Sequence, residues 1–302
     1  MHFKNAIFYR LSKPFTPEFN QLGALMADHA FTPCSGQQLS SYGWISPHPA
    51  HSFMVFESNG ALLITAQRES KLLPASSINR LLTERVAKIK STEDRTVGRK
   101  EKMQLKDEIV IDLLPRALSK FDTTQALIIP NENLIIVDAS GFTAAEELLS
   151  LLRQTVGSLS IVSPEVINST STVMGSWLIA DQSESFALGA DCSMQDNEQG
   201  KAVFKGVDLL SEHVIGHVND GYQVITIGVC WDSNYFMSLN NDLRISKIKA
   251  TDELSEAISN DNDDPLVRLD TDTARLSLEF QRLWQDLTTA FGGESKAATQ
   301  TA

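Results

Sequence analysis

The chain has 302 residues, of which 42% are hydrophobic, 21% charged and 7% aromatic, and its formal net charge is −12. This composition argues against a disordered or collagen-like chain, and its apolar runs are far shorter than the roughly 20 residues that span a bilayer. The three cysteines form no C-x-x-C pair, which argues against a disulfide framework and a cysteine zinc site. We therefore expect a cytoplasmic protein that lacks a secretory signal and has no membrane partner.

The first 67 residues predict a strand, a helix and a hairpin. Residues 6–11 have the pattern of a strand, and a helix is expected from Thr16, as its N-cap, to Ala30. The pair Asn59-Gly60 predicts a tight turn between two strands, because both residues tolerate positive φ.

Residues 68–162 repeat the plan of a hairpin and a helix. A long basic helix is expected from Ala75 to Leu114, with an interruption near Gly98. A second hairpin is expected over 125–139, and a helix then runs from Thr143 to Val156 and ends at Gly157.

Residues 163–206 are rich in Ser, Asn and Gly, and we expect a domain boundary near Ser163. The predicted elements beyond it are a helix over 208–219, strands over 222–231, 234–239 and 243–249, and an amphipathic helix over 266–291.

The strand signals occur as hairpins and not as crossovers, which favours an α+β fold. The expected division is an N-terminal hairpin–helix region, 1–162, which could itself hold two subdomains, and a C-terminal α+β region, 163–302.

The negative net charge hides a segregation of charges. Residues 68–120 contain 13 basic and 8 acidic side chains, whereas residues 121–302 contain 10 basic and 27 acidic ones. A phosphate backbone responds to charge within a Debye length of roughly 8 Å. The basic stretch is therefore either a solvated helix face or a polyanion-binding face on an acidic body.

The spacing of the basic residues in this stretch would place several of them on the same face of a helix. On one continuous helix Arg80, Arg85, Lys88 and Arg95 lie within about 140° of one another. Arg99, Lys102 and Lys106 share a face at spacings of three and four. No Phe, Tyr or Trp occurs between residues 57 and 120, so stacking on single-stranded bases is not expected here and duplex binding without sequence preference is favoured.

The basic stretch ends in the segment LLPRALSKF, residues 113–121. Leu118 and Phe121 are three residues apart, and we expect them to form an apolar knob beside Arg116 and Lys120. This knob is either a core-packing turn or a subunit contact.

Catalytic and metal-binding motifs are not evident. His213 and His217 have the helical spacing of two zinc ligands, but no third ligand is evident, and surface histidines are the favoured interpretation. Asp270 and Asp272 are expected to cap a helix and not to form a two-metal nuclease site. We expect no enzyme activity and no cofactor.

Several blocks, spaced along the whole chain, resemble the bacterial recombination-associated protein RdgC family. They are YRL (9–11), FTPC (31–34), GW (43–44), KLLP (71–74), LKDEIVIDLLPRALSKF (105–121), LLRQTVGSLSIV (151–162) and GGE (292–294). The block at 105–121 is long and specific.

The resemblance implies a non-enzymatic, nucleoid-associated protein that binds DNA. It implies a ring-shaped homodimer with a basic central hole, which encircles double-stranded DNA without marked sequence preference. The sequence leaves open whether single-stranded DNA is also a ligand. It also implies that the protein restrains the RecA recombinase and acts at replication forks.

The expected DNA-binding residues combine the basic stretch with this resemblance. They are Arg68, Lys71, Arg80, Arg85, Lys88, Arg95, Arg99, Lys100, Lys102, Lys106, Arg116 and Lys120. The expected dimer interface includes Leu118, where the family often has Phe, and Phe121. A departure occurs at 203–209, where the family's basic-Lys-Gln-Asp-Leu motif is reduced to Lys205-Gly206-Val207-Asp208-Leu209.

Two other functions compete with this expectation. The chain could act mainly by contacting the recombinase, with DNA binding incidental. It could also be a metal-dependent nuclease that uses the acidic cluster at 261–272.

Overall fold

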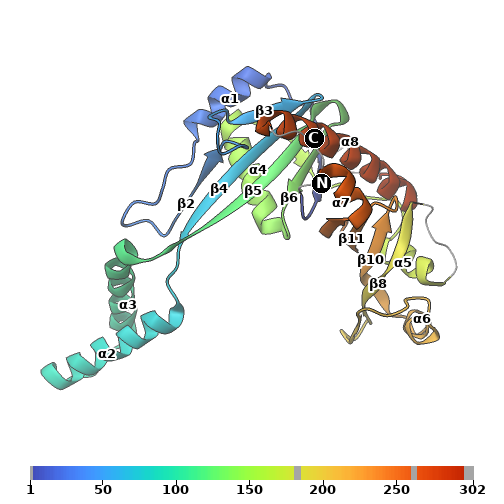
Figure 1. Cartoon of the computed structure of the whole chain (residues 1–302). Coiled ribbons are helices and arrows are strands. Elements are labelled where there is room, and N and C mark those ends of the chain that lie inside the picture. Colours follow the sequence, from blue (N-terminus) through green and yellow to red (C-terminus); the bar gives the residue numbers. More distant parts are fainter. Residues whose placement is uncertain (1–2, 180–184, 260–263, 296–302) are drawn as a thin grey trace. The chain divides into compact units, whose positions relative to one another are not determined.

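A computed structural model describes residues 3–179, 185–259 and 264–295. It shows two antiparallel sheets with helices, so the expected α+β class is confirmed (Figure 1). The chain divides into two compact units. The first unit comprises Met1–Met26, Ser46–Thr65 and Thr124–Ala302, and the second comprises Ala27–Ile45 and Ala66–Thr123. The expected boundary near Ser163 stays a prediction.

The larger sheet has the strand order β2-β4-β5-β6-β1-β7, with β3 paired to β4. Its strands are β1 (Ile7–Leu11), β2 (Ser40–Ile45), β3 (Val55–Ser58), β4 (Ala61–Lys71), β5 (Ser119–Ile129), β6 (Leu134–Asp138) and β7 (Ile161–Val162). Strand β6 lies between two neighbours and is buried on both faces from Leu134 to Val137, which explains its unbroken apolar run.

Both predicted hairpins of this sheet are confirmed. Asn59 and Gly60 have φ values of 52° and 72°, and Ser58 pairs with Ala61 across the turn. In the second hairpin Ile129 pairs with Leu134, and Asn133 takes the left-handed conformation with φ of 50°. Asn and Gly occupy these positions because they tolerate positive φ.

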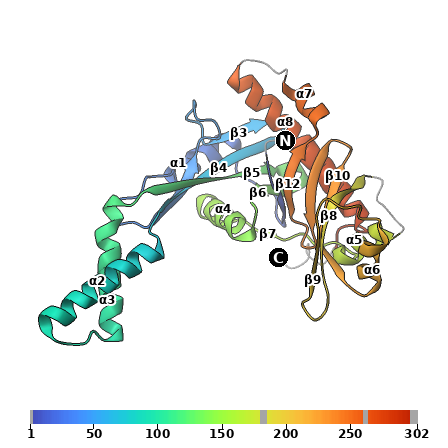
Figure 2. The same cartoon turned by 60° about the horizontal axis from the view of Figure 1, so that its bottom comes forward.

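The smaller sheet has the strand order β12-β11-β10-β8-β9 and lies wholly in the first unit (Figure 2). Its strands are β8 (Phe186–Gln195), β9 (Lys201–Phe204), β10 (Gln223–Trp231), β11 (Tyr235–Asn240) and β12 (Ile245–Ala250). The three strands expected between residues 222 and 249 are confirmed. Strands β8 and β9 have no counterpart in the sequence prediction, because bulges shift the register where β8 pairs with β10 and disturb its alternation.

Every helix expected from the sequence is present, but several begin or end at other residues than expected. They are α1 (Phe19–Asp28), α2 (Ala75–Glu93), α3 (Arg99–Leu113), α4 (Phe142–Val156), α5 (Thr170–Ile179), α6 (Glu212–Asn219), α7 (Asp252–Ser259) and α8 (Pro265–Ala290). Helix α6 starts four residues later than expected, because the Asp208 carboxylate accepts the Leu210 N–H and forms a turn there. Helices α5 and α7 were not expected.

The N-terminal cap of α8 corrects the interpretation of the acidic cluster. The Asp264 side chain accepts the Leu266 N–H, so Asp264 is the cap residue. The expectation that Asp270 and Asp272 are caps is therefore wrong, because both lie inside α8. Residues 261–263 lie outside the described residues.

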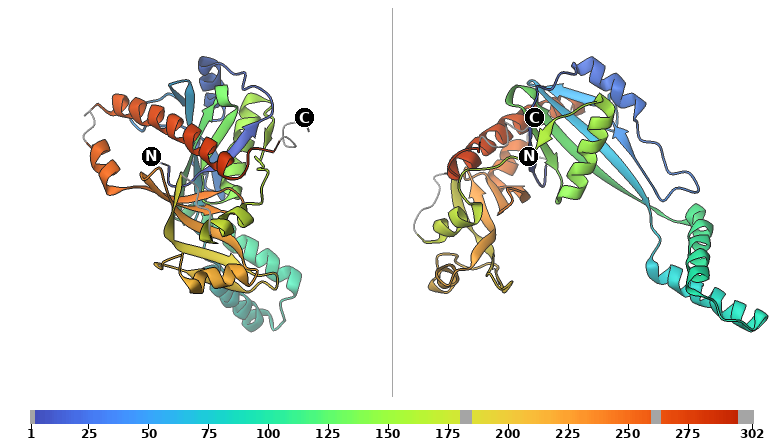
Figure 3. Two further views of the ribbon diagram at one scale, coloured as in Figure 1. Left: turned by 90° about the vertical axis from the view of Figure 1, so that its right-hand side faces the viewer. Right: turned by 180° about the vertical axis from the view of Figure 1, so that it is seen from behind.

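Helix α8 supplies a large part of the core of the first unit. Figure 3 shows this helix in red from two further directions. Phe280 and Trp284 pack against Phe8 with ring centroids 6.0 and 4.9 Å apart, and Phe280 also contacts Phe3. All four side chains are at most 5% exposed. In the described part of the chain no helix combines the length and apolarity needed to cross a bilayer.

Arg10 ties the C-terminal segment to strand β1. Its guanidinium donates two hydrogen bonds to the Glu294 carboxylate, at 2.7 and 2.6 Å, and a third to the carbonyl of Glu132. It also lies over the Trp284 ring, 5.5 Å from the centroid. A bidentate arginine–carboxylate pair is stronger than a pair of neutral hydrogen bonds. The YRL and GGE blocks of the sequence therefore meet at this pair.

We predict that Glu294→Gln lowers the free energy of unfolding by about 1 kcal/mol, because it removes the charge from a partly exposed bidentate pair. The urea midpoint measures this change. Glu84→Gln is the matched control, since it breaks the exposed Arg80–Glu84 pair within α2 and should change stability by less than about 0.5 kcal/mol. Equal shifts in both variants would contradict the role given to Arg10.

Candidate nucleic-acid interface

Helices α2 and α3 form a hairpin in the second unit and contact each other (Figure 1). Among the described residues of α2 only Ile78 is buried, and in α3 only Ile109 is. Val97 and Leu114, which lie just outside the two helices, are also buried. Most of the surface of both helices therefore faces solvent, and their charged side chains are accessible.

The interruption expected near Gly98 is confirmed. Helix α2 ends at Glu93 because Asp94 takes the left-handed conformation, with φ of 48°, and α3 begins directly after Gly98. Arg95 lies in the connection between the helices. The expectation that Arg95 shares a helical face with Arg80, Arg85 and Lys88 is therefore wrong.

Three arginines of the hairpin are paired with carboxylates. Arg80 contacts Glu84 at 3.4 Å. Arg85 on α2 contacts two carboxylates of α3, Glu108 at 3.4 Å and Asp112 at 2.5 Å, and thereby links the two helices.

Arg95 is paired in the same way within the connection. It contacts Glu101 and Glu93, each at 2.6 Å. Its hydrogen bonds to these carboxylates raise the pKa of Arg95, and the bond to Glu101 has the larger effect. The Arg95 hydrogen bond in turn lowers the pKa of Glu101. Paired arginines of this kind offer less charge to a phosphate than unpaired ones.

A second group of cations has no ion-pair partner within the described residues. Its members are exposed: Lys88, Lys90, Arg99, Lys100, Lys102, Lys106 and Arg116. Arg99, Lys102 and Lys106 share one face of α3, as expected from their spacing. Lys90 was missed by the sequence analysis, although its place in the last turn of a basic helix could have identified it. We call these seven residues the unpaired cations.

The remaining expected DNA-binding residues lie on or beside strands β4 and β5. Arg68 lies over the Tyr42 ring, 5.4 Å from the centroid, and Lys120 contacts Asp122 at 2.8 Å. The Lys71 side chain is 14% exposed and lies 3.3 Å from Glu69. The role of all these residues in DNA binding stays a prediction.

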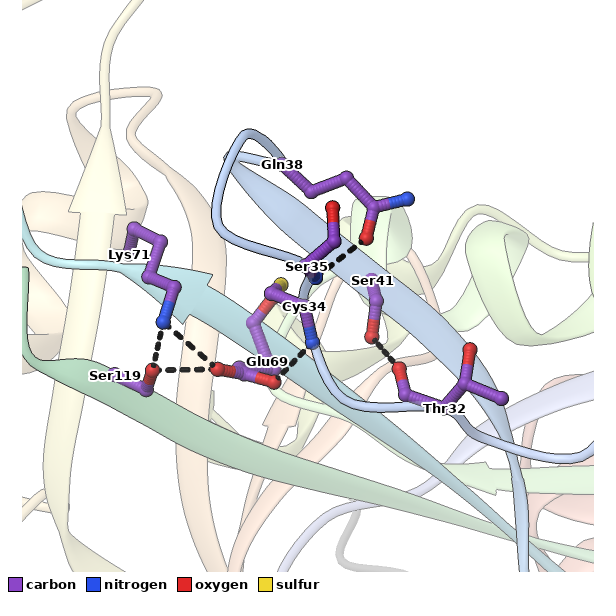
Figure 4. Close-up of polar contacts among 8 residues, drawn as sticks. All are labelled: Thr32, Cys34, Ser35, Gln38, Ser41, Glu69, Lys71 and Ser119. Atoms are coloured by element: carbon purple, nitrogen blue, oxygen red, sulfur yellow. Dashed lines mark hydrogen bonds and ion pairs between the residues drawn. The ribbon is translucent and has the colours of Figure 1, made fainter. Parts of the chain in front are cut away.

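Glu69 joins three segments of the second unit (Figure 4). The Ser119 hydroxyl of β5 donates to its Oε1, and the Cys34 N–H donates to its Oε2 at 2.7 Å. Lys71 Nζ donates to the Ser119 Oγ at 2.9 Å and completes the network. Glu69 is 3% exposed, so these contacts satisfy a buried carboxylate next to the chain ends that enter and leave the α2–α3 hairpin.

The network has a structural and not a nucleophilic character. The hydrogen bonds from Ser119 and from the Cys34 N–H lower the pKa of Glu69 to about 2. A carboxylate with so low a pKa is a weak base near neutral pH, so it does not activate the Ser119 hydroxyl.

The apolar knob expected at Leu118 and Phe121 has a different geometry. Residue Ala117 is extended and β5 begins at Ser119, so Leu118 and Phe121 do not lie on a helix and the helical-spacing argument is wrong. Both side chains are nonetheless exposed, at 76% and 55%. Leu118 accepts a backbone hydrogen bond from Leu72, which is 49% exposed.

Within the described residues no three His, Cys, Asp or Glu side chains lie close enough to hold a metal ion. His213 and His217 lie on α6 with ring centroids 5.2 Å apart, and both contact the Phe204 ring. His217 Nδ1 also contacts the His213 carbonyl at 2.9 Å.

We predict that Glu69 makes stability depend on pH in the acid range. Its pKa in the folded chain is below its ordinary value of 4.5, so its contribution is complete above that value and is lost as the pH falls towards about 2. Glu69→Gln should therefore lower the urea midpoint more at pH 7 than at pH 3. Glu57→Gln, at an exposed position, is the control. A Glu69→Gln effect that is the same at both pH values would refute this prediction.

Comparison with known proteins finds relatives over nearly the whole chain. A family model described as "Putative exonuclease, RdgC" matches residues 1–294. The recombination-associated protein RdgC of Shewanella sp. (strain W3-18-1) is 36% identical over 300 residues, which cover 97% of this chain and 98% of the relative. The protein of the same name from Tolumonas auensis is 33% identical over 299 residues, which cover 97% and 99%. The resemblance seen in the sequence is confirmed, and the chain belongs to the RdgC family.

Proposed function

We propose that this chain is a DNA-binding protein that forms a ring-shaped homodimer with a basic central hole. The ring encircles duplex DNA in the nucleoid without sequence preference. By occupying the duplex it restrains the RecA recombinase and acts at replication forks. The names of the relatives, which describe recombination-associated proteins, support the biological setting of this proposal.

The observation that carries the proposal is the group of unpaired cations. Carboxylates neutralise Arg80, Arg85 and Arg95, whereas the seven unpaired cations keep their charge exposed on and beside one helical hairpin. Lysine and arginine side chains in a row suit the regular spacing of phosphates. They read no base by themselves, which agrees with binding that does not depend on sequence.

The exposed apolar side chains beside the hairpin supply the proposed dimer contact. Leu118, Phe121 and Leu72 are 76%, 55% and 49% exposed, and burying such side chains against a second copy is favourable. In this proposal Leu118 takes the place where the family often has Phe.

The description of the family model as an exonuclease makes a nuclease the second candidate. The described part of the acidic cluster argues for structural roles. Asp264 caps α8, and Asp272 lies 3.9 Å from Arg268. The experiment below includes a readout for cleavage.

We predict that the triple variant Arg99→Glu, Lys102→Glu and Lys106→Glu abolishes measurable duplex binding near physiological salt. For every phosphate that the variant no longer neutralises, the slope of log K against log[salt] should decrease in magnitude by about 0.9. Fluorescence anisotropy with a labelled duplex at several salt concentrations measures both quantities.

The matched control reverses three exposed charges outside the hairpin: Lys4→Glu, Lys13→Glu and Arg268→Glu. Unchanged affinity in the α3 triple variant would refute the proposed interface. A triple variant that no longer binds DNA but still restrains RecA would show that the chain acts by protein contact. Shortened DNA after incubation with Mg²⁺ would favour the exonuclease.

A further inference from the structure

The five-stranded sheet of the first unit has one packed face and one open face. On strand β10 the side chains of Ile227, Val229 and Trp231 are at most 1% exposed and belong to the core, which α5 helps to cover. The intervening positions, Thr226, Gly228 and Cys230, are only partly buried. The strand register places these positions on the opposite, open face.

Small residues leave a hollow in this open face. Gly228 pairs with Ser238 of β11, and Thr226 pairs with Ser193 of β8. A Cβ at Gly189 would lie 2.9 Å from the carbonyl oxygen of Gly228, so the two strands approach too closely there for a larger residue. The result is a hollow of about 150 Å³, lined in part by Asp191, Ser193, Thr226, Ser238, Lys205 and Lys247.

Lysines stand at both edges of the sheet. Lys201 begins β9 and Lys205 directly follows its last residue, and Lys247 and Lys249 lie on β12. These are the outer strands, roughly 19 Å apart at about 4.8 Å per strand spacing. All four lysines are exposed, and within the described residues none has an ion-pair partner.

An exposed aromatic ring lies on the same face. Phe236 of β11 is 51% exposed, and its cross-strand neighbours are Cys230 and Lys249. No other described aromatic ring contacts it. An exposed ring beside an unpaired lysine is the combination that stacks on a base and binds the adjoining phosphate.

The acidic group that faces the hollow fits a base better than a phosphate. Asp191 lines the hollow, and its carboxylate accepts the Gly206 N–H at 3.0 Å. A carboxylate repels phosphate but accepts hydrogen bonds from an exocyclic amino group. The hydroxyl groups of Ser193 and Ser238 can donate or accept beside it.

We propose that this open sheet face binds single-stranded DNA. Phe236 stacks on one base, the hollow takes the edge of a neighbouring base, and the lysines of β9 and β12 contact the phosphates. In a duplex the base faces are already stacked on each other, so Phe236 has no base face to contact. The inference rests on the proposed DNA-binding function and adds a site for single strands that is separate from the unpaired cations.

The test compares Phe236→Ala with Phe236→Trp on a labelled 20-nucleotide single strand and on its duplex. Phe236→Ala should weaken single-strand binding about 5- to 160-fold, the range for loss of one stacking ring, and duplex binding less than twofold. Phe236→Trp should keep the affinity. The four natural tryptophans are at most 5% exposed, so single strands should quench the exposed indole of this variant and duplex should not.

The outcomes separate this inference from the proposed function. If Phe236→Ala leaves single-strand binding unchanged, or weakens both substrates equally, the open-face site is refuted while DNA binding stands. If the unaltered chain binds neither substrate, the proposed function itself fails. A second variant, Lys247→Glu with Lys249→Glu, should lower the salt slope on single strands by about 0.7 for each phosphate that it no longer neutralises.

Discussion

A buried carboxylate, that of Glu69, holds together the part of the second unit from which the α2–α3 hairpin extends. Strand β4 leads into the hairpin and β5 leads out of it. Glu69 on β4 receives hydrogen bonds from Ser119 on β5 and from the backbone of Cys34. Leaving such an acceptor without donors would be costly, so the three segments stay together. The exposed cations are therefore held in place by contacts outside their own helices.

The hairpin uses its charges in two ways. Arg80, Arg85 and Arg95 bind carboxylates, and the Arg85 contacts to Glu108 and Asp112 link two helices that each bury a single side chain. Most of the unpaired cations are lysines, which act as flexible point charges. Their charge is not neutralised inside the chain, so a polyanion can use it although the whole protein is acidic.

Local rules predicted much of the fold. Asn59-Gly60, Gly157 and the break near Gly98 act through backbone conformation at one position, and the structure has a turn or a helix end at each. Strands β8 and β9 could not be predicted, because bulges and close glycine contacts replace the regular alternation. Arg95 and the Leu118–Phe121 pair were misplaced because one helical phase was extended past its real end. The sequence shows which side chains of the candidate site are basic, but the distinction between paired and unpaired cations needs the folded hairpin, since Arg85 and Asp112 are 27 residues apart.

The central claim, that a dimeric ring encloses duplex DNA, is tested most directly by dissociation from linear and covalently closed circular duplexes of equal length. After a shift to high salt, a ring should leave the linear duplex through its ends and stay much longer on the circle. Leu118→Glu, which should break the dimer contact, should remove this difference. Equal dissociation of the unaltered chain from both duplexes would contradict enclosure and leave a protein that binds only the surface of DNA.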